Sequence, residues 1–150
     1  MIPTRLFDFI DHQNEHAPLE KAFTTKYNGV WESLNTQQFC DKAHQISCAL
    51  LALGVESQDK IAMISSTNRT EWNLVDIGLL AIGAVNVPIY PTISSEDYEY
   101  ILNHSESQYC FVSDQEVYDK VVAIKDKVKS LKKIYSFDFY NLFTFFYLFF

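Results

Sequence analysis

The residues best spaced to do chemistry lie in the stretch HQNEH at positions 12–16, which fits the pattern H-x-x-E-H. In inverted zinc peptidases this pattern places two imidazoles one helical turn apart as zinc ligands, and the glutamate activates a water molecule. His12, Glu15 and His16 would take these roles. The pattern fixes only three positions, however, and arises easily by chance. It also lies at the end of an expected amphipathic helix, just before Pro18, where solvated polar residues are the simpler interpretation.

The chain contains no glycine-rich phosphate-binding loop. Its four glycines (Gly29, Gly54, Gly78 and Gly83) form neither GxGxxG nor GxxxxGK[ST]. The hydroxyl-rich run SST at 65–67 has no histidine or lysine beside it in the sequence to act as a base. Glu96 and Asp97 suit the first turn of a helix, where the helix dipole favours negative charge. We therefore predict no catalytic, cofactor-binding or metal-binding residue in this chain.

Composition narrows the class of protein. The 150 residues are 48% hydrophobic and 21% charged, which is typical of a globular domain with a real core. The net charge of −7 argues against a nucleic-acid-binding protein. No basic segment followed by an apolar one opens the sequence, so we expect a cytoplasmic protein. Three cysteines without CxxC spacing predict reduced thiols packed in the core.

The elements that must position any site form two groups. In the first 54 residues, Thr4 is expected to cap a helix that runs to about Glu15, and Asn28-Gly29 is expected to join two short strands at 21–26 and 30–33. Asn35 and Gln38 then form a capping box for a long helix that Gly54 ends. Its expected core face is Phe39, Ala43, Ile46, Leu50 and Leu53.

From residue 60 onward, strands and helices alternate. The expected strands are 60–65, 86–89, 109–112 and 133–137, and the expected helices are 71–82, 95–104 and 115–131. The last of these helices is predicted from apolar residues spaced 4, 3, 4 and 3 (Val117, Val121, Ile124, Val128 and Leu131). Such alternation implies βαβ crossovers. The predicted fold class is α/β, with a parallel sheet covered by helices on both faces and preceded by a short hairpin.

The stretch NVPIYPTISSED at 86–97 is expected to be a strand, a proline-locked turn and a helix capped by Ser94 or Ser95. Pro88 and Pro91 fix φ and lack an N–H donor, so we expect them to stop the strand and turn the chain.

The last twelve residues, FYNLFTFFYLFF, break the alternation, because eight of them are aromatic and none is charged. Three interpretations stay open. The first is a membrane contact, which the five upstream lysines between 125 and 133 suggest, although a spanning helix needs about 20 apolar residues. The second is a core strand that needs a partner. The third is a product of a frame change or truncation after Asp138. We therefore divide the chain into an α/β region at 1–138 and an aromatic tail at 139–150.

The sequence of residues 64–114 resembles the N-terminal part of long-chain acyl-CoA synthetases (fatty-acid–CoA ligases) of the AMP-forming, adenylate-forming superfamily. The matching residues are Ser66, Asn68, Glu71, Trp72, Gly83-Ala84-Val85, VPIYPT at 87–92, Glu96-Asp97-Tyr98, Ile101-Leu102, His104-Ser105-Glu106 and Val112-Ser113-Asp114. Trp31, Leu53-Gly54-Val55 and Asp59-Lys60-Ile61 extend the resemblance toward the N-terminus. It spans about residues 5–138.

The resemblance implies an acid–thiol ligase that joins a fatty acid to coenzyme A in two steps, through an acyl-adenylate, with ATP, Mg²⁺ and CoA. It also implies fatty acid, ATP and CoA as partners, with peripheral membrane contact and no nucleic acid or zinc. The family's phosphate loop, nucleotide contacts, magnesium carboxylate and mobile C-terminal domain have no counterpart in these 150 residues. We therefore expect an N-terminal fragment that is inactive alone and binds none of these cofactors. The alternative is a non-catalytic α/β module that binds a partner protein or lipid.

Overall fold

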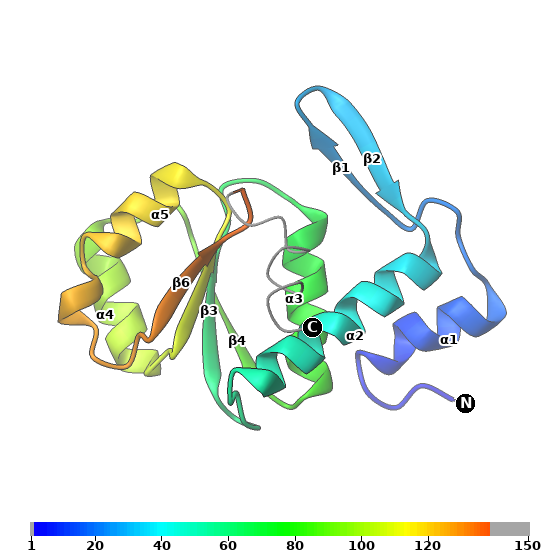
Figure 1. Cartoon of the computed structure of the whole chain (residues 1–150), viewed down its shortest axis with the longest axis horizontal. Helices are drawn as coiled ribbons and strands as arrows, with labels where there is room; N and C mark the ends of the chain where they lie inside the picture. The colour runs from blue at the N-terminus through cyan, green and yellow to red at the C-terminus, as the bar shows by residue number, and fades with distance from the viewer. Residues whose placement is uncertain (1, 139–150) are drawn as a thin grey trace.

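The structure is a computed structural model and describes residues 2–138. The elements in chain order are α1 (Asp8–His16), β1 (Phe23–Tyr27), β2 (Val30–Leu34), α2 (Thr36–Ala52), β3 (Lys60–Ile64), α3 (Thr70–Ala81), β4 (Val85–Ile89), α4 (Ser95–Ser105), β5 (Tyr109–Val112), α5 (Gln115–Val122), the 3₁₀ turn η1 (Lys125–Lys127) and β6 (Lys133–Ser136). Figure 1 shows a layered body of helices around a sheet, with a hairpin that projects from it.

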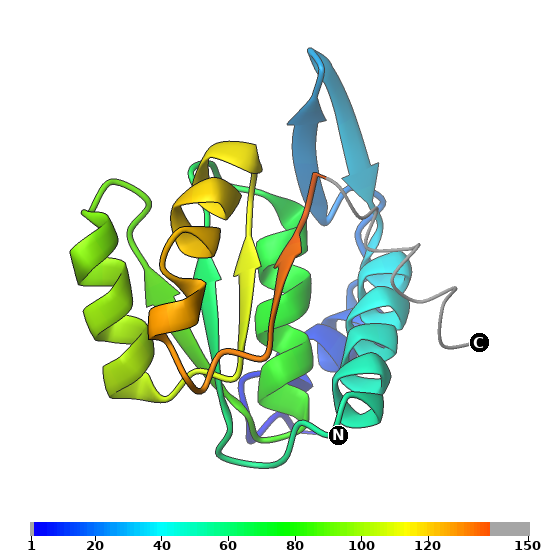
Figure 2. The ribbon, with the colours of Figure 1, turned by 60° about the vertical axis from the view of Figure 1, so that its left-hand side comes forward.

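Four parallel strands form the sheet, in the order β4-β3-β5-β6. Because side chains alternate across a strand, neighbouring residues of β3 enter different cores. Ile61 and Met63 pack with α2 and α3, whereas Ala62 and Ile64 pack with α4 and α5. The two helix pairs therefore cover opposite faces of the sheet, as Figure 2 shows. The predicted α/β class, with a parallel sheet covered on both faces, is confirmed.

The two-stranded hairpin forms around Asn28-Gly29, as predicted. Both residues have positive φ, 48° and 86°, as a tight turn between twisted strands requires. The hairpin stands apart from the four-stranded sheet (Figure 1) but is tied to α3 by a buried contact. The hydroxyl of Thr25 accepts the backbone N–H of Thr70 at 2.8 Å and lies 2.7 Å from the Thr70 hydroxyl. A side chain of β1 thus caps the start of α3, which has no cap of its own.

Helix α2 follows its sequence signals closely. Asn35 and Gln38 form the predicted capping box, and Gly54 has φ +79° beyond the last turn. Four of the five predicted core residues of α2 are buried, and Leu53 is partly buried. Helix α3 lies against this face through Gly78, where an added Cβ would be 2.7 Å from Cγ2 of Ile46. The α2–α3 contact is therefore too close for any side chain at position 78 without movement.

The first helix begins later than predicted. Helix α1 starts at Asp8, not after Thr4, and no side chain caps it. The carboxylate of Asp8 instead accepts the N–H groups of Thr4 and Arg5, at 3.1 and 2.9 Å. The Thr4 hydroxyl donates to the same carboxylate at 3.2 Å. Thr4 is therefore not the predicted N-cap, because the helix begins four residues later and Phe7 occupies the N-cap position.

The predicted helix 115–131 is wrong in its second half. Helix α5 ends at Val122, and a 3₁₀ turn and an irregular segment lead to β6. The return to the amino end of β6 is completed by the 3₁₀ turn and the segment after it, which need not be helical to bury apolar side chains. The apolar residues beyond the helix are still buried, namely Ile124, Val128 and Leu131. Their spacing therefore predicted burial correctly but did not show where the helix ends.

The predicted role of Pro88 needs correction. Pro88 does not stop the strand, because it lies inside β4 opposite Met63, and Ile89 still pairs with Ile64. Since β4 is an edge strand among the described residues, the missing N–H of Pro88 costs no bond within the sheet.

The prediction that all three cysteines pack in the core also needs correction. The cysteines are free, but only Cys110 is in the core, whereas Cys40 and Cys48 are partly buried on α2.

No helix within residues 2–138 has the length and apolar character to cross a bilayer. The three interpretations of the tail fall on 139–150, outside the described residues.

Candidate functional site

The order of the strands marks one place in the sheet for a site. Strand β4 lies on one side of β3 and β5 lies on the other, so the chain reverses its direction of travel across the sheet between β3 and β5. In open parallel sheets, ligands bind outside the carboxyl ends of the strands at such a switch point. Here the segments that leave these two ends are the hydroxyl-rich run 65–67 and Ser113-Asp114.

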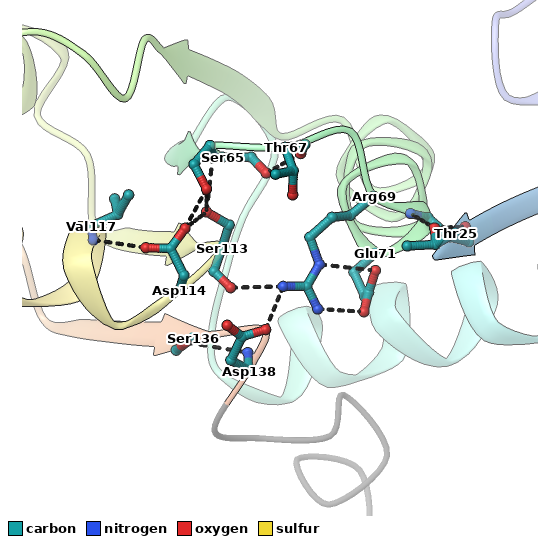
Figure 3. Close-up of polar contacts among 12 residues, drawn as sticks. Thr25, Ser65, Thr67, Arg69, Glu71, Ser113, Asp114, Val117, Ser136 and Asp138 are labelled. Carbon is teal, nitrogen blue, oxygen red and sulfur yellow. Dashed lines mark hydrogen bonds and ion pairs between the residues drawn. The ribbon is translucent and has the colours of Figure 1, made fainter. Parts of the chain in front are cut away.

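These two segments are joined by hydrogen bonds around the carboxylate of Asp114 (Figure 3). The hydroxyls of Ser66 and Ser113 both donate to Asp114 Oδ2, the latter at 2.6 Å. The backbone N–H of Ser66 donates to the Ser113 hydroxyl at 2.9 Å. Asp114 Oδ1 accepts the N–H of Val117 at 3.0 Å and so caps α5. Partial burial acts to raise the pKa of Asp114, but these hydrogen bonds outweigh it and lower the pKa.

Arg69 forms the second half of the cluster. Its guanidinium faces the carboxylate of Glu71, with Nη2–Oε1 at 2.9 Å and Nε–Oε2 at 3.4 Å. Nη1 donates to the carbonyl of Ser113 at 2.8 Å and to the carboxylate of Asp138. Burial acts to lower the pKa of Arg69, and the ion pairs with Glu71 and Asp138 reverse this and raise it. Arg69 is therefore a permanent cation, bound by two carboxylates.

Two aromatic rings flank this guanidinium. Its central carbon lies 5.7 Å from the ring of Tyr27 and 5.6 Å from that of Phe137. Burial and the neighbouring carboxylate of Glu71 raise the pKa of Tyr27 to about 12. Arg69 thus connects the end of β1, the start of α3, the end of β5 and the residues after β6. We call Ser66, Arg69, Glu71, Ser113, Asp114 and Asp138 the carboxyl-edge network.

The network is closed on itself. The two serine hydroxyls donate to Asp114, and the Arg69 charge is neutralised by Glu71 and Asp138. It contains no imidazole that could move a proton, and both serine hydroxyls and four of the five N–H groups of Arg69 are bonded within it. Its clear role is to fix the positions of four chain segments at one edge of the sheet. The prediction that this chain supplies no catalytic or cofactor-binding residue stays a prediction.

The H-x-x-E-H residues lie far from this edge, on the last turn of α1. The rings of His12 and His16 are 4.2 Å apart between centroids, and Nδ1 of His16 lies 2.9 Å from the carbonyl oxygen of His12. Glu15 is exposed and lies 3.9 Å from the same ring. Within residues 2–138 no group of three or more His, Cys, Asp or Glu side chains could hold a metal ion.

A hollow of about 460 Å³ lies between α1 and α2. It is lined by Asp11, Asn14, Gln37, Cys40, Asp41, His44 and Gln45. Partial burial, with the carboxylates of Asp11 and Asp41, raises the pKa of the Cys40 thiol to about 11. The thiol is therefore protonated at neutral pH and is a poor nucleophile.

Comparison with known proteins decides the family. The family model described as AMP-binding enzyme matches residues 10–144. The chain belongs to this family of AMP-binding enzymes. It is 31% identical over 107 residues to the long-chain-fatty-acid–CoA ligase FadD15 of Mycobacterium bovis, which covers 71% of this chain and 18% of the relative. It is also 31% identical, over 71% of this chain and 16% of the relative, to the long-chain-fatty-acid–CoA ligase heimdall of Drosophila melanogaster.

Solved structures of the family share the fold. The anthranilate CoA ligase AuaEII, in complex with anthranoyl-AMP, aligns with a TM-score of 0.80 at 20% identity, over 99% of this chain and 28% of that one. A long-chain-fatty-acid–CoA ligase, FadD1 of Archaeoglobus fulgidus, aligns with a TM-score of 0.78 at 20% identity, over 95% and 29%. The predicted relationship to long-chain acyl-CoA synthetases is confirmed. The chain spans less than a fifth of the length of the curated relatives described above.

Four of the family-like residues of the sequence lie at the edge just described. Ser66, Glu71, Ser113 and Asp114 all belong to the carboxyl-edge network. Sequence reasoning quoted these four as family markers but missed Arg69, which joins them. The rule that sites lie at the carboxyl ends of parallel strands could have found the edge, because the expected strands at 60–65 and 109–112 lead directly into it. The family match ends at residue 144, so the boundary at 138 stays a prediction.

Proposed function

We propose that this chain supplies the N-terminal α/β part of a long-chain fatty-acid–CoA ligase. The reaction of the whole enzyme is ATP, fatty acid and CoA to acyl-CoA, AMP and pyrophosphate, through an acyl-adenylate. The observation that carries the proposal is the family match over residues 10–144, together with relatives that are long-chain-fatty-acid–CoA ligases. The cytoplasm, with peripheral contact to a membrane, is the proposed location.

Within the described residues, the carboxyl-edge network does not suit the cofactors of that reaction. A site for ATP and Mg²⁺ needs phosphate-binding donors and a carboxylate free to face the metal. In the carboxyl-edge network the donors of Ser66 and Ser113 are used by Asp114, and the charge of Arg69 is used by Glu71 and Asp138. The proposal is therefore that other parts of the ligase bind ATP, Mg²⁺ and CoA, and that this chain holds the scaffold beneath them.

Exchange of labelled pyrophosphate into ATP tests the first half of this proposal. The purified 150-residue chain, with palmitate and Mg²⁺, should give no exchange above a blank without protein. A full-length relative such as FadD15 is the positive control in the same assay. Exchange by the 150-residue chain that depends on fatty acid would show that the chain has a nucleotide site of its own.

A graft tests the second half. Residues 1–138 replace the corresponding segment of FadD15, and the chimera is assayed for acyl-CoA formation. Activity well above that of FadD15 lacking this segment is expected. The matched control carries Gly78→Val in the graft, because a side chain at this position separates α2 from α3. A chimera that is folded and inactive would favour the alternative, a non-catalytic module that binds a protein or lipid.

A further inference from the structure

The segment between α5 and β6 concentrates positive charge in an acidic protein. Residues 125–133, KDKVKSLKK, hold five of the chain's twelve Lys and Arg residues and only one of its nineteen acidic residues. We name this segment the lysine loop. We propose that the lysine loop docks the protein on the surface of a lipid bilayer that contains anionic headgroups. This proposal names the surface for the peripheral membrane contact in the proposed function, and it does not depend on ligase activity.

The fold presents these lysines outward from a fixed backbone. Had the helix continued to residue 131, the lysines would form the polar side of an ordinary amphipathic helix. Because α5 ends at Val122, they lie on a 3₁₀ turn and the irregular segment after it. Val128 and Leu131 are buried and hold the loop against the sheet, while Lys127, Lys129, Lys132 and Lys133 are exposed.

Little of this charge is neutralised within the described residues. Lys127 pairs with Glu99 of α4 at 3.3 Å. Lys132 donates to the neutral oxygen Oε1 of Gln108 at 2.7 Å, and Lys133 lies 5.0 Å from the centroid of the Tyr135 ring. Lys125 and Lys129 make no hydrogen bond or ion pair between residues 2 and 138. Four of the five ammonium groups thus have no carboxylate partner in the described part of the chain.

Neighbouring elements extend the surface in a way that suits a bilayer. The backbone N–H of Lys132 donates to the carbonyl of Gln108, whose N–H donates to the carbonyl of Lys60, so a sixth lysine lies along the same amino edge of the sheet. The side chain of Lys60 is exposed. Val122, at the end of α5 and three residues before the lysine loop, is 44% exposed. Lysines beside an exposed apolar side chain suit a surface that rests on headgroups.

The distribution of charge also favours a bilayer as the binding partner and indicates how the protein lies on it. The lysines are point charges spread over several elements, which suits a plane of anionic headgroups better than the planar, paired recognition of a single phosphate group. The other residues carry a net charge of about −11 (seven Lys and Arg against eighteen Asp and Glu), so an anionic bilayer repels the rest of the chain as a whole. Since the lysine loop precedes β6, it lies at the amino edge of the sheet, and the carboxyl-edge network faces away from the membrane (Figure 2).

Co-sedimentation with vesicles tests this surface. The 150-residue chain is mixed with vesicles of phosphatidylcholine alone and with vesicles that contain about 30 mol% phosphatidylserine. The test variant is Lys125→Glu/Lys129→Glu, which reverses two lysines that have no described partner. The matched control is Lys21→Glu/Lys26→Glu, which makes the same change in net charge near and on the hairpin, far from the lysine loop (Figure 1).

We expect binding only to the anionic vesicles, with loss of binding at about 0.5 M salt. The test variant should bind at least about 30-fold more weakly, because each lysine at the surface contributes and each glutamate repels. The control variant should bind within about 3-fold of the unmodified chain. Circular dichroism checks that both variants are folded. If the test variant unfolds, Lys125→Gln/Lys129→Gln replaces it, with about 10-fold weaker binding expected.

Three results would overturn the proposal. Equal weakening by both pairs of substitutions would show a general charge effect with no docking surface. Binding that the test variant retains would place the membrane contact elsewhere and leave the peripheral location intact. No binding to either vesicle would remove the membrane contact. The graft assay for ligase activity is unaffected by any of these results, so the two proposals fail separately.

Discussion

The guanidinium of Arg69 and the carboxylate of Asp138 are paired across 69 positions of the chain. Arg69 precedes α3, and Asp138 follows β6, so the pair fixes the far edge of the sheet against the hairpin and the first crossover helix. Both residues also belong to a polar cluster whose side chains reach the end of β1, the start of α3, the end of β5 and the residues after β6. The integrity of the carboxyl edge should therefore depend on this arginine.

Replacement of Arg69 by methionine should lower the free energy of unfolding by about 2 kcal/mol, because it leaves the partly buried carboxylate of Glu71 without its partner. Urea unfolding followed by circular dichroism measures this change. The double variant Arg69→Met/Glu71→Leu should recover part of the loss, since it leaves no buried charge. Arg5→Met, which breaks the exposed pair with Asp8, is the control and should change stability much less. Similar small losses for Arg69→Met and Arg5→Met would show that the carboxyl-edge network is not structural.

The carboxylate of Asp114 should make the free energy of unfolding fall more steeply as the pH is lowered. Its pKa is lowered in the folded state, so it stabilises the fold above its ordinary pKa of 3.8, and this stabilisation is lost as the pH falls. At pH 7 Asp114→Asn should cost about 1–2 kcal/mol, because the amide nitrogen that replaces Oδ2 cannot accept the two serine hydroxyls, although the amide oxygen can still cap α5. The difference from the unmodified chain should shrink at pH 3.

Thermal unfolding at pH 7 and pH 3 gives both values. Asp126→Asn, at an exposed position in the lysine loop, is the matched control. A difference between Asp114→Asn and the unmodified chain that stays constant with pH would mean that the Asp114 carboxylate is not held ionised by Ser66 and Ser113.

Local signals predicted most of the fold. The capping box at Asn35 and Gln38, the Asn28-Gly29 turn and the left-handed stop at Gly54 each depend on residues within about four positions of one another, and all three are present. The alternation of apolar runs also located every strand of the sheet to within two residues at each end. Such features can be predicted from the sequence because the residues that form them are close together in the chain.

The errors have a different origin. The spacing of Val117, Val121 and Ile124 indicates which side of the crossover is buried, but it does not show where the helix ends. Pro88 looked like a strand stop because the sequence does not show that β4 lies at an edge. The expected strands point to the carboxyl edge, but the bonds that connect its segments could not be predicted, since they join residues 44 to 69 positions apart. Long-range pairing of this kind follows from topology and has no local signature.

The thiol of Cys40 should become far more reactive when the chain unfolds. Its pKa of about 11 in the folded state lies two units above the ordinary value of 9.0, so the thiolate population should rise roughly 100-fold on unfolding. Labelling by iodoacetamide at pH 8, in buffer and in urea, followed by peptide mass spectrometry, measures the two rates. Because the raised pKa keeps the folded thiol protonated, the free energy of unfolding should fall as the pH rises from 9 toward 11.

Cys110 and the Asp11 carboxylate provide the controls for this experiment. Cys110 is fully buried and should be unlabelled in buffer, which shows that the chain stays folded during the reaction. Asp11→Asn removes one of the carboxylates that raise the Cys40 pKa, so it should speed the labelling of Cys40 in buffer and leave the rate in urea unchanged. Equal labelling of Cys40 in buffer and in urea would contradict the raised pKa.

The close approach of α2 and α3 at Gly78 should make this position intolerant of even a methyl group. An added Cβ would lie 2.7 Å from Cγ2 of Ile46 and 3.2 Å from the carbonyl oxygen of Ala43. The second contact is with backbone, so rotation of the Ile46 side chain cannot relieve both. Gly78→Ala should therefore lower the free energy of unfolding by about 1–2 kcal/mol, although alanine is the better helix former by about 1 kcal/mol.

A double-mutant cycle separates the clash with Ile46 from the clash with the backbone. Ile46→Ala alone should cost about 2–4 kcal/mol, because it leaves a cavity between α2 and α3. In the Gly78→Ala background the same substitution should cost about 1 kcal/mol less, since the new methyl group occupies part of that cavity. Strict additivity of the two losses would assign the whole effect to the Ala43 carbonyl, and a Gly78→Ala variant more stable than the unmodified chain would show that the helices separate freely at this contact.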